Sequence, residues 1–225
     1  MDEIVHDESS HVPGNDLAAI NRKLDSFGAQ YQNQLADQEV STTRCTKYAS
    51  QLADGGVAGN FDKSAEALDA KFNQIKNDAA TYAETLDAAR AREVQLVSTH
   101  KAFNEKKSRV MEWCDSSHGL ISLNEQGNPI GLEQSCGLAT VENKVDAFQA
   151  EIKLQQQVMH TLVAEMEVLS GTLTEGLHAD ASAVAEQQVA RKADIEELNA
   201  LAEDYEKKLN AALAREQHLV YTEKR

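Results

Sequence analysis

The stretch that decides the fold is "DAARAREVQLVSTHKAF", residues 87–103, which contains neither glycine nor proline. A close copy, "NAALAREQHLVYTEKR", occupies residues 210–225. Aligned at an offset of 123, residues 86–101 and 209–224 are identical at 10 of 16 positions. Self-similarity of this kind indicates a chain built from repeated supersecondary units.

A second pair of segments repeats at a slightly different offset. Residues 16–34, "DLAAINRKLDSFGAQYQNQ", match residues 137–155, "GLATVENKVDAFQAEIKLQ", at 7 of 19 positions with an offset of 121. The difference of two residues must lie in the loop between the paired segments. Two units are therefore expected, residues 1–101 and 102–225.

The composition favours an all-α fold. The chain has only two prolines and 5% aromatic residues, while alanine, glutamine, glutamate and leucine recur throughout. Heptad spacing supports this class, because apolar residues step by three and four along one predicted seam of the second repeat. These positions are Leu138, Val141, Val145, Phe148, Ile152, Gln155, Met159, Leu162, Met166, Leu169 and Leu173.

The same seam in the first repeat has a weak middle. Its first positions are apolar, its middle positions are polar and predict looser packing, and its last positions are again mostly apolar. In order, the positions are Leu17, Ile20, Leu24, Phe27, Tyr31, Gln34, Gln38, Ser41, Cys45, Tyr48 and Leu52.

A further helix follows in each repeat, after a glycine-containing loop. The loops are "LADGGVAGN" and "SGTLTEGLHADAS", where glycines end one helix and Asn60 or Asp180 could cap the next. The predicted seam of the first copy is Phe61, Ala65, Leu68, Phe72, Ile75, Ala79, Tyr82, Leu86 and Ala89. Its counterparts are Val184, Gln188, Arg191, Ile195, Leu198, Ala202, Tyr205, Leu209 and Ala212.

Residues 60–118 contain no glycine or proline, so a single helix can run from the first unit into the second. Its later part supplies Phe103, Val110, Trp113 and Leu120 to a seam, and "NEQGNP" then breaks it. The second unit is thus predicted to hold three antiparallel helices, over residues 102–125, 131–171 and 180–225. The predicted core residues across both units are Phe27, Tyr82, Phe103, Val110, Trp113, Phe148 and Tyr205.

Three long heptad helices, with the last helix of one unit continuing into the first helix of the next, resemble the spectrin-repeat family. Trp113 lies in the middle of the first helix, as a core tryptophan does in that family, and "AFNEKKSRVMEW", residues 102–113, resembles repeat starts of the α-actinin rod. The resemblance covers residues 16–225. It implies an elongated rod of tandem three-helix repeats that acts as a spacer and forms an antiparallel homodimer. It also implies actin filaments as partners, bound through domains outside this chain, and a cytoplasmic, cytoskeletal location.

The first unit departs from this pattern because its own first helix is missing. The equivalent of residues 102–125 would fall mostly before residue 1, and "MDEIVHDESSHVPGN" is too short and polar to replace it. Either the chain is a piece of a longer protein, or a partner supplies the helix. The two-helix unit leaves an apolar stripe facing solvent on one side, and an exposed stripe of that length normally finds a partner. Its members are Phe27, Tyr31, Phe61, Phe72, Ile75 and Tyr82.

No motif for catalysis, metal binding or a cofactor is evident in the sequence. The seven histidines show no HExxH or two-turn pairing, and Cys45, Cys114 and Cys136 have no ligand spacing. A formal charge of -15 disfavours nucleic acid, and no apolar run reaches the 18 residues of a transmembrane segment. We therefore expect a non-enzymatic protein with no metal, no cofactor and no secretory leader.

One local reversal of charge suggests an alternative function. Residues 90–109 carry six basic and two acidic side chains, a net of +4. This basic segment could bind an acidic receptor tail or a phosphoinositide headgroup, which would make the chain a monomeric helical-bundle binding module. Its candidate interaction residues are Arg90, Arg92, Lys101, Lys106, Lys107 and Arg109.

Overall fold

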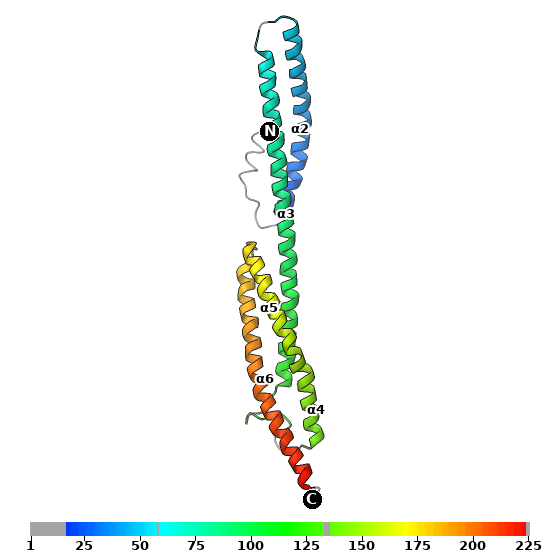
Figure 1. Cartoon of the computed structure of the whole chain (residues 1–225), viewed down its shortest axis with the longest axis vertical. Coiled ribbons are helices and arrows are strands. Elements are labelled where there is room, and N and C mark those ends of the chain that lie inside the picture. The colour runs from blue at the N-terminus through cyan, green and yellow to red at the C-terminus, as the bar shows by residue number, and fades with distance from the viewer. Residues whose placement is uncertain (1–16, 58, 133–135, 224–225) are drawn as a thin grey trace. The chain divides into compact units, whose positions relative to one another are not determined.

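The computed structural model describes residues 17–57, 59–132 and 136–223, and over these residues the chain is helical (Figure 1). The only β pairing among them is an isolated bridge between Leu123 and Pro129. The predicted all-α class is therefore confirmed. The helices are α2 (Leu17–Asp54), α3 (Phe61–Leu120), α4 (Leu138–Phe148), a π turn η1 (Gln149–Lys153), α5 (Leu154–Glu175) and α6 (Ala181–Glu223).

The chain divides into two units between Gln95 and Leu96, six residues before the boundary that the sequence suggested. Helix α3 continues through this point as one helix of 60 residues. The continuous helix that the sequence predicted from Asn60 to His118 therefore forms. The predicted absence of a first helix in the first unit concerns residues 1–16, which lie outside the described residues.

In the first unit, α2 and the first part of α3 lie side by side and are joined by a glycine-rich turn (Figure 1). Their shared core is small and aromatic. The ring of Phe27 meets Tyr82 edge to face at 5.1 Å and stacks on Tyr31 at 5.2 Å. Ala79 and Leu86 complete this buried cluster. The heptad spacing thus brings the first turns of α2 against the last turns of this part of α3.

In the second unit, three helical segments surround one continuous core. They are the last part of α3, the α4–η1–α5 segment and α6 (Figure 1). Phe148 lies 5.6 Å from Tyr205 in this core, and Phe103 and Val110 of α3 are fully buried. A third helical segment gives each of the other two a second neighbour, so two rows of side chains per helix are covered.

The loop between α3 and α4 is longer than the sequence predicted. Helix α3 ends at Leu120 rather than near residue 125, because the Ser122 hydroxyl donates to the Gly119 carbonyl at 2.7 Å and the chain turns. The Asn124 side chain then accepts the N–H groups of Gln126 and Asn128, closing a tight turn. Leu120 is exposed, contrary to its predicted seam position.

Helix α4 begins at Leu138 rather than at residue 131. Gly137, immediately before it, has φ +85°, a conformation that glycine adopts without strain. Between the two helices, Ile121 and Leu132 are buried and continue the core, so the loop covers the end of the bundle.

The middle segment of the second unit contains the π turn, which the heptad analysis did not predict. At the π turn the buried row shifts locally from Gln155 to Gln156 and returns to the predicted register at Met159. Gln155 is exposed, in contrast to the prediction, and Gln156 is half-buried and donates to the Asn199 side chain. The indole N–H of Trp113 donates to the Glu151 carbonyl within the turn at 3.1 Å.

The repeated phrase at the end of α6 holds the start of α4. Glu216 is buried, and its Oε2 accepts the N–H of Gly137 at 3.3 Å. Its neighbour Arg215 donates to the Leu132 carbonyl at 3.2 Å and also contacts Glu216. A carboxylate at a helix N-terminus satisfies an otherwise unpaired N–H and interacts favourably with the helix dipole.

The first repeat carries the same pair of residues, and its glutamate is also buried, but the Oε1 atom of Glu93 has no hydrogen-bond partner among the described residues. Glu93 is buried, and the Arg92 guanidinium lies 3.6 Å from its Oε1. The position equivalent to Gly137 is residue 16, which is outside the described residues. The recurrence of "ARE" therefore preserves a buried carboxylate beside an arginine, which the sequence analysis did not predict.

Removal of the Glu216 carboxylate should destabilise the second unit. Glu216→Ala leaves the Gly137 N–H without its acceptor, and we expect the free energy of unfolding to fall by about 1–3 kcal/mol. Glu216→Gln keeps an acceptor and should cost less. Urea denaturation followed by the fluorescence of Trp113, the single tryptophan, reports on this unit. The exposed Glu203→Ala is the matched control, with a change within about 0.5 kcal/mol. Equal losses for Glu216→Ala and Glu203→Ala would contradict the capping role.

Candidate interaction surfaces

Two rows of residues on α2 differ sharply in burial. Thr42 and Ala49 are buried, as are their repeat counterparts in the second unit, Val163 and Ser170. This first row is buried in both units. We expect this because both units contain the same contact between the two helices of the repeat.

The second row is covered in the second unit alone. Met166 and Leu173 are both 0% exposed, whereas their repeat counterparts Cys45 and Leu52 are exposed. The sequence placed Cys45, Tyr48 and Leu52 on a seam, and the structure leaves all three accessible, with Tyr48 at 61%. The third helical segment of the second unit has no counterpart among the described residues of the first.

The open surface continues onto the first part of α3. Phe61 is exposed, but its repeat counterpart Val184 is almost fully buried. Leu68, one heptad later, is also exposed. We call Cys45, Tyr48, Leu52, Phe61 and Leu68 the open face of the first unit. It is an apolar surface of the type that normally contacts a partner.

The second unit carries an apolar stripe of its own on α5. Leu154, Val158 and Val168 are all exposed, with Val168 at 69%. Their spacing of four and ten residues places them on one side of an α-helix, because 100° per residue brings them within about 80° of one another. We call these three residues the α5 stripe.

Most of the predicted basic segment is engaged within the chain. Lys106 pairs with Glu165 of α5, and Lys107 donates to the Gln187 side chain of α6 at 2.9 Å. Both contacts join α3 to the other helices of the second unit. Lys101 pairs with Glu105 one turn away, at 3.9 Å.

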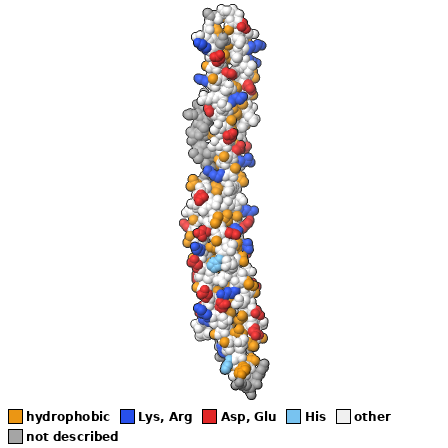
Figure 2. Space-filling view, in the orientation of Figure 1, with side chains coloured by type: hydrophobic (Ala, Val, Ile, Leu, Met, Phe, Trp, Pro, Cys, Tyr) orange, Lys and Arg blue, Asp and Glu red, His pale blue; other side chains and the backbone are white. Residues whose placement is uncertain are grey.

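The remaining three basic residues are divided between the units, with Arg90 and Arg92 in the first and Arg109 in the second. Arg92 contacts Glu93, as described above, and both Arg90 and Arg109 are exposed. On the face shown in Figure 2, acidic and basic side chains are interspersed. Such a surface gives a weaker attraction for an anionic ligand than the sequence count of +4 suggested.

The predicted core residues lie in the cores of their own units. Phe27 and Tyr82 are buried in the first unit, and Phe103, Val110, Trp113, Phe148 and Tyr205 in the second. Burial raises the pKa of Tyr205 above its ordinary value. Trp113 combines packing with its hydrogen bond to the π turn, which a core role alone did not predict.

The chemistry available in the described residues is limited. Burial, with Asp194 and Asp115 acting in the same direction against Arg191, raises the pKa of the Cys114 thiol to about 11. That thiol stays protonated at neutral pH and is a poor nucleophile.

A depression between α5 and α6, beside His160 and Lys192, has a volume of about 160 Å³. Ligand pockets usually enclose roughly 300–1,000 Å³.

The three cysteines provide a direct test of these placements. At micromolar protein and pH 8, Cys45 should react fastest with a thiol reagent because it is exposed on the open face. Cys114 should react only on unfolding, since a pKa of about 11 leaves roughly one thiol in a thousand ionised. Cys45→Ala should remove the fast phase in a stopped-flow assay. A fast phase that survives this substitution but disappears in Cys114→Ala would contradict both assignments.

Comparisons with known proteins give no relative that indicates a function, so the functional assignment rests on the chain's own residues. Searches against protein-family models, curated proteins and solved structures found no match. Among the described residues, no helix combines the length and apolar character needed to cross a bilayer. The internal repeat and the geometry of the open face are thus the observations from which a function is inferred.

Proposed function

We propose that this chain is a non-enzymatic rod segment of the spectrin-repeat type, resembling the α-actinin rod of actin-crosslinking cytoskeletal proteins. It acts as a spacer and forms an antiparallel homodimer. The observation that carries the proposal is the open face: three of its side chains, Cys45, Leu52 and Phe61, are exposed although their repeat counterparts in the second unit are buried. A helix from another chain would restore the burial that the repeat lacks.

A second copy of the same chain offers a suitable apolar surface. The α5 stripe lies on the second unit and the open face on the first, so the two surfaces are complementary in kind. In a two-fold pair, each first unit contacts the second unit of its partner, and every contact occurs twice. An antiparallel arrangement satisfies both open faces at once, which favours homodimerisation over a single added helix.

The continuous helix α3 supports the spacer role. A hinge within it would break several backbone hydrogen bonds together, so a helix joining two units resists bending. In this proposal, actin filaments are bound by domains outside the chain, and the protein works in the cytoplasm on the cytoskeleton.

The dimer is tested by placing a charge in the α5 stripe. Wild-type chain should sediment as a dimer of about 49 kDa at high concentration, twice the 24.7 kDa of one chain. Val168→Lys should raise the dimer dissociation constant at least tenfold, because a buried unpaired lysine is costly. Val189→Lys, at an equally exposed valine on α6, is the matched control and should leave it unchanged.

The alternative, a monomeric binding module, makes the opposite prediction. A wild-type chain that stays monomeric at the highest soluble concentration would contradict the proposed dimer. Equal weakening by Val168→Lys and Val189→Lys would contradict the assigned surface. Protection of Cys45 from thiol reagents on dimerisation is the additional result expected from contact at the open face.

A further inference from the structure

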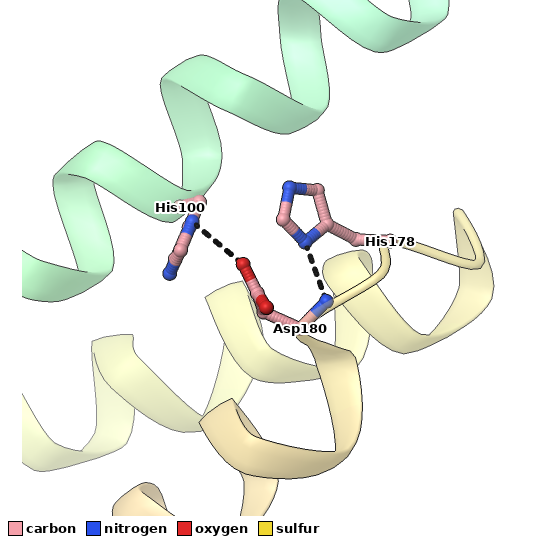
Figure 3. A group of neighbouring side chains, drawn as sticks. All are labelled: His100, His178 and Asp180. Carbon is pink, nitrogen blue, oxygen red and sulfur yellow. Dashed lines mark hydrogen bonds and ion pairs between the residues drawn. The ribbon is translucent and has the colours of Figure 1, made fainter. Parts of the chain in front are cut away.

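Two histidines and an aspartate of the second unit meet where α6 begins (Figure 3). His100 lies on α3, His178 lies in the turn after α5, and Asp180 immediately precedes α6. The Nδ1 atom of His100 is 3.8 Å from Asp180 Oδ2, and the two imidazole centroids are 4.9 Å apart. One potential ligand atom from each residue lies within 4.8 Å of the other two.

The fold fixes the position of this cluster through the backbone. In the turn, the N–H of His178 donates to the Leu173 carbonyl at 2.9 Å, and Leu177 adopts φ +56°. Gly176 packs so closely on Leu96 that a Cβ at this position would collide with the leucine side chain. Leu96 and His100 are one helical turn apart on α3, so the contact that seats the turn also places His100 beside it.

The side chains lie close together without a direct bond between His100 and Asp180. A separation of 3.8 Å is too long for a hydrogen bond between the imidazole and the carboxylate. His178 Nδ1 accepts the N–H of Asp180 at 3.1 Å, which fixes the orientation of that ring (Figure 3). The three side chains thus come from three different segments and converge at one place without direct bonds between their side chains.

We propose that His100, His178 and Asp180 bind a divalent transition metal of the zinc class. Two imidazole nitrogens and one carboxylate oxygen are a common ligand set for Zn²⁺, whereas Ca²⁺ and Mg²⁺ prefer oxygen ligands alone. Ligand atoms of a tetrahedral zinc site lie about 3.3 Å apart, given bonds of about 2.0–2.1 Å. Small side-chain rotations close the present distances to that value, and water takes the fourth position.

Metal binding to His178 has a cost that limits affinity, because its Nδ1 already accepts the N–H of Asp180. A metal on Nδ1 takes that lone pair, and a metal on Nε2 leaves the proton on Nδ1, so in either case the Asp180 N–H loses its acceptor. Asp180 is also more than half exposed, so water competes for the ion. We expect micromolar affinity. The bound metal would link α3 to the start of α6, stabilising the second unit at the turn.

The site is specific to one repeat. The turn of the first unit that corresponds to residues 176–180 lies within "GGVAGN", residues 55–60, which has no histidine or carboxylate. His100 corresponds to Glu223 at the offset of 123. The ligands are therefore an addition to the shared repeat and are not required by its packing.

Calorimetric titration of metal-free full-length chain with ZnCl₂ tests the proposal. One ion per chain should bind, and the melting temperature should rise by several degrees on saturation. His100→Ala and His178→Ala should each weaken binding at least tenfold, and MgCl₂ and CaCl₂ should give no saturable heat. His160→Ala and His218→Ala, two exposed histidines on α5 and α6, are matched controls that should bind zinc as the wild type does.

Cobalt provides a second readout that does not depend on stability. Co²⁺ should give visible d–d bands of a low-coordinate nitrogen and oxygen site, and these bands should be lost in His100→Gln and Asp180→Asn, whose folding is checked by circular dichroism. The proposal is overturned if zinc binds undiminished to a chain lacking both His100 and His178. A thiolate-to-cobalt charge-transfer band would likewise overturn it by assigning the metal to the cysteines.

Discussion

The structure depends on one packing requirement: each long amphipathic helix must have both of its buried rows covered. In the second unit a third helical segment meets this requirement, so Met166 and Leu173 are fully buried beside Val163 and Ser170. In the first unit the described residues cover one row only. The same heptad sequence thus gives a closed core in one place and an exposed apolar surface in the other, because burial depends on the number of neighbouring helices.

The repeated phrase has a second function besides continuing a helix. In α6 it carries Arg215 and Glu216, which hold the loop and the first turn of α4. The equivalent Arg92 and Glu93 are followed by further helix within α3. The phrase thus combines a junction between units with a cap for the neighbouring helix. A buried carboxylate is costly unless it is paired, so its presence in both repeats indicates a shared structural role.

Much of the fold could be predicted from the sequence because heptad spacing and glycine-rich loops are local signals. The all-α class, the continuity of α3 and the positions of the two glycine-rich turns followed from them. The π turn could not be predicted, since its extra residue is accommodated through a tertiary contact with Trp113. The buried glutamates were missed for the same reason. The acceptor role of Glu216 exists only because the end of α6 meets the start of α4.

The surfaces were harder to predict than the helices. The basic segment was visible as a net charge, but Lys106 and Lys107 contact residues that lie 59 and 80 positions away in the sequence. His100 is likewise far from His178 and Asp180 in the sequence, and no spacing motif connects the three residues. Such clusters arise from the bundle, so a single sequence gives no sign of them before the helices are placed.

The central claim is that the described residues of the first unit leave uncovered a row of side chains that a third helical segment covers in the second unit. Native-state hydrogen exchange of the monomeric chain measures this directly, because equivalent amides of the two repeats are internal controls. Amides of residues 36–52 should exchange at least tenfold faster than those of residues 157–173, and those of residues 61–75 faster than those of residues 184–198. Equal protection of the paired segments in the monomer would contradict the account.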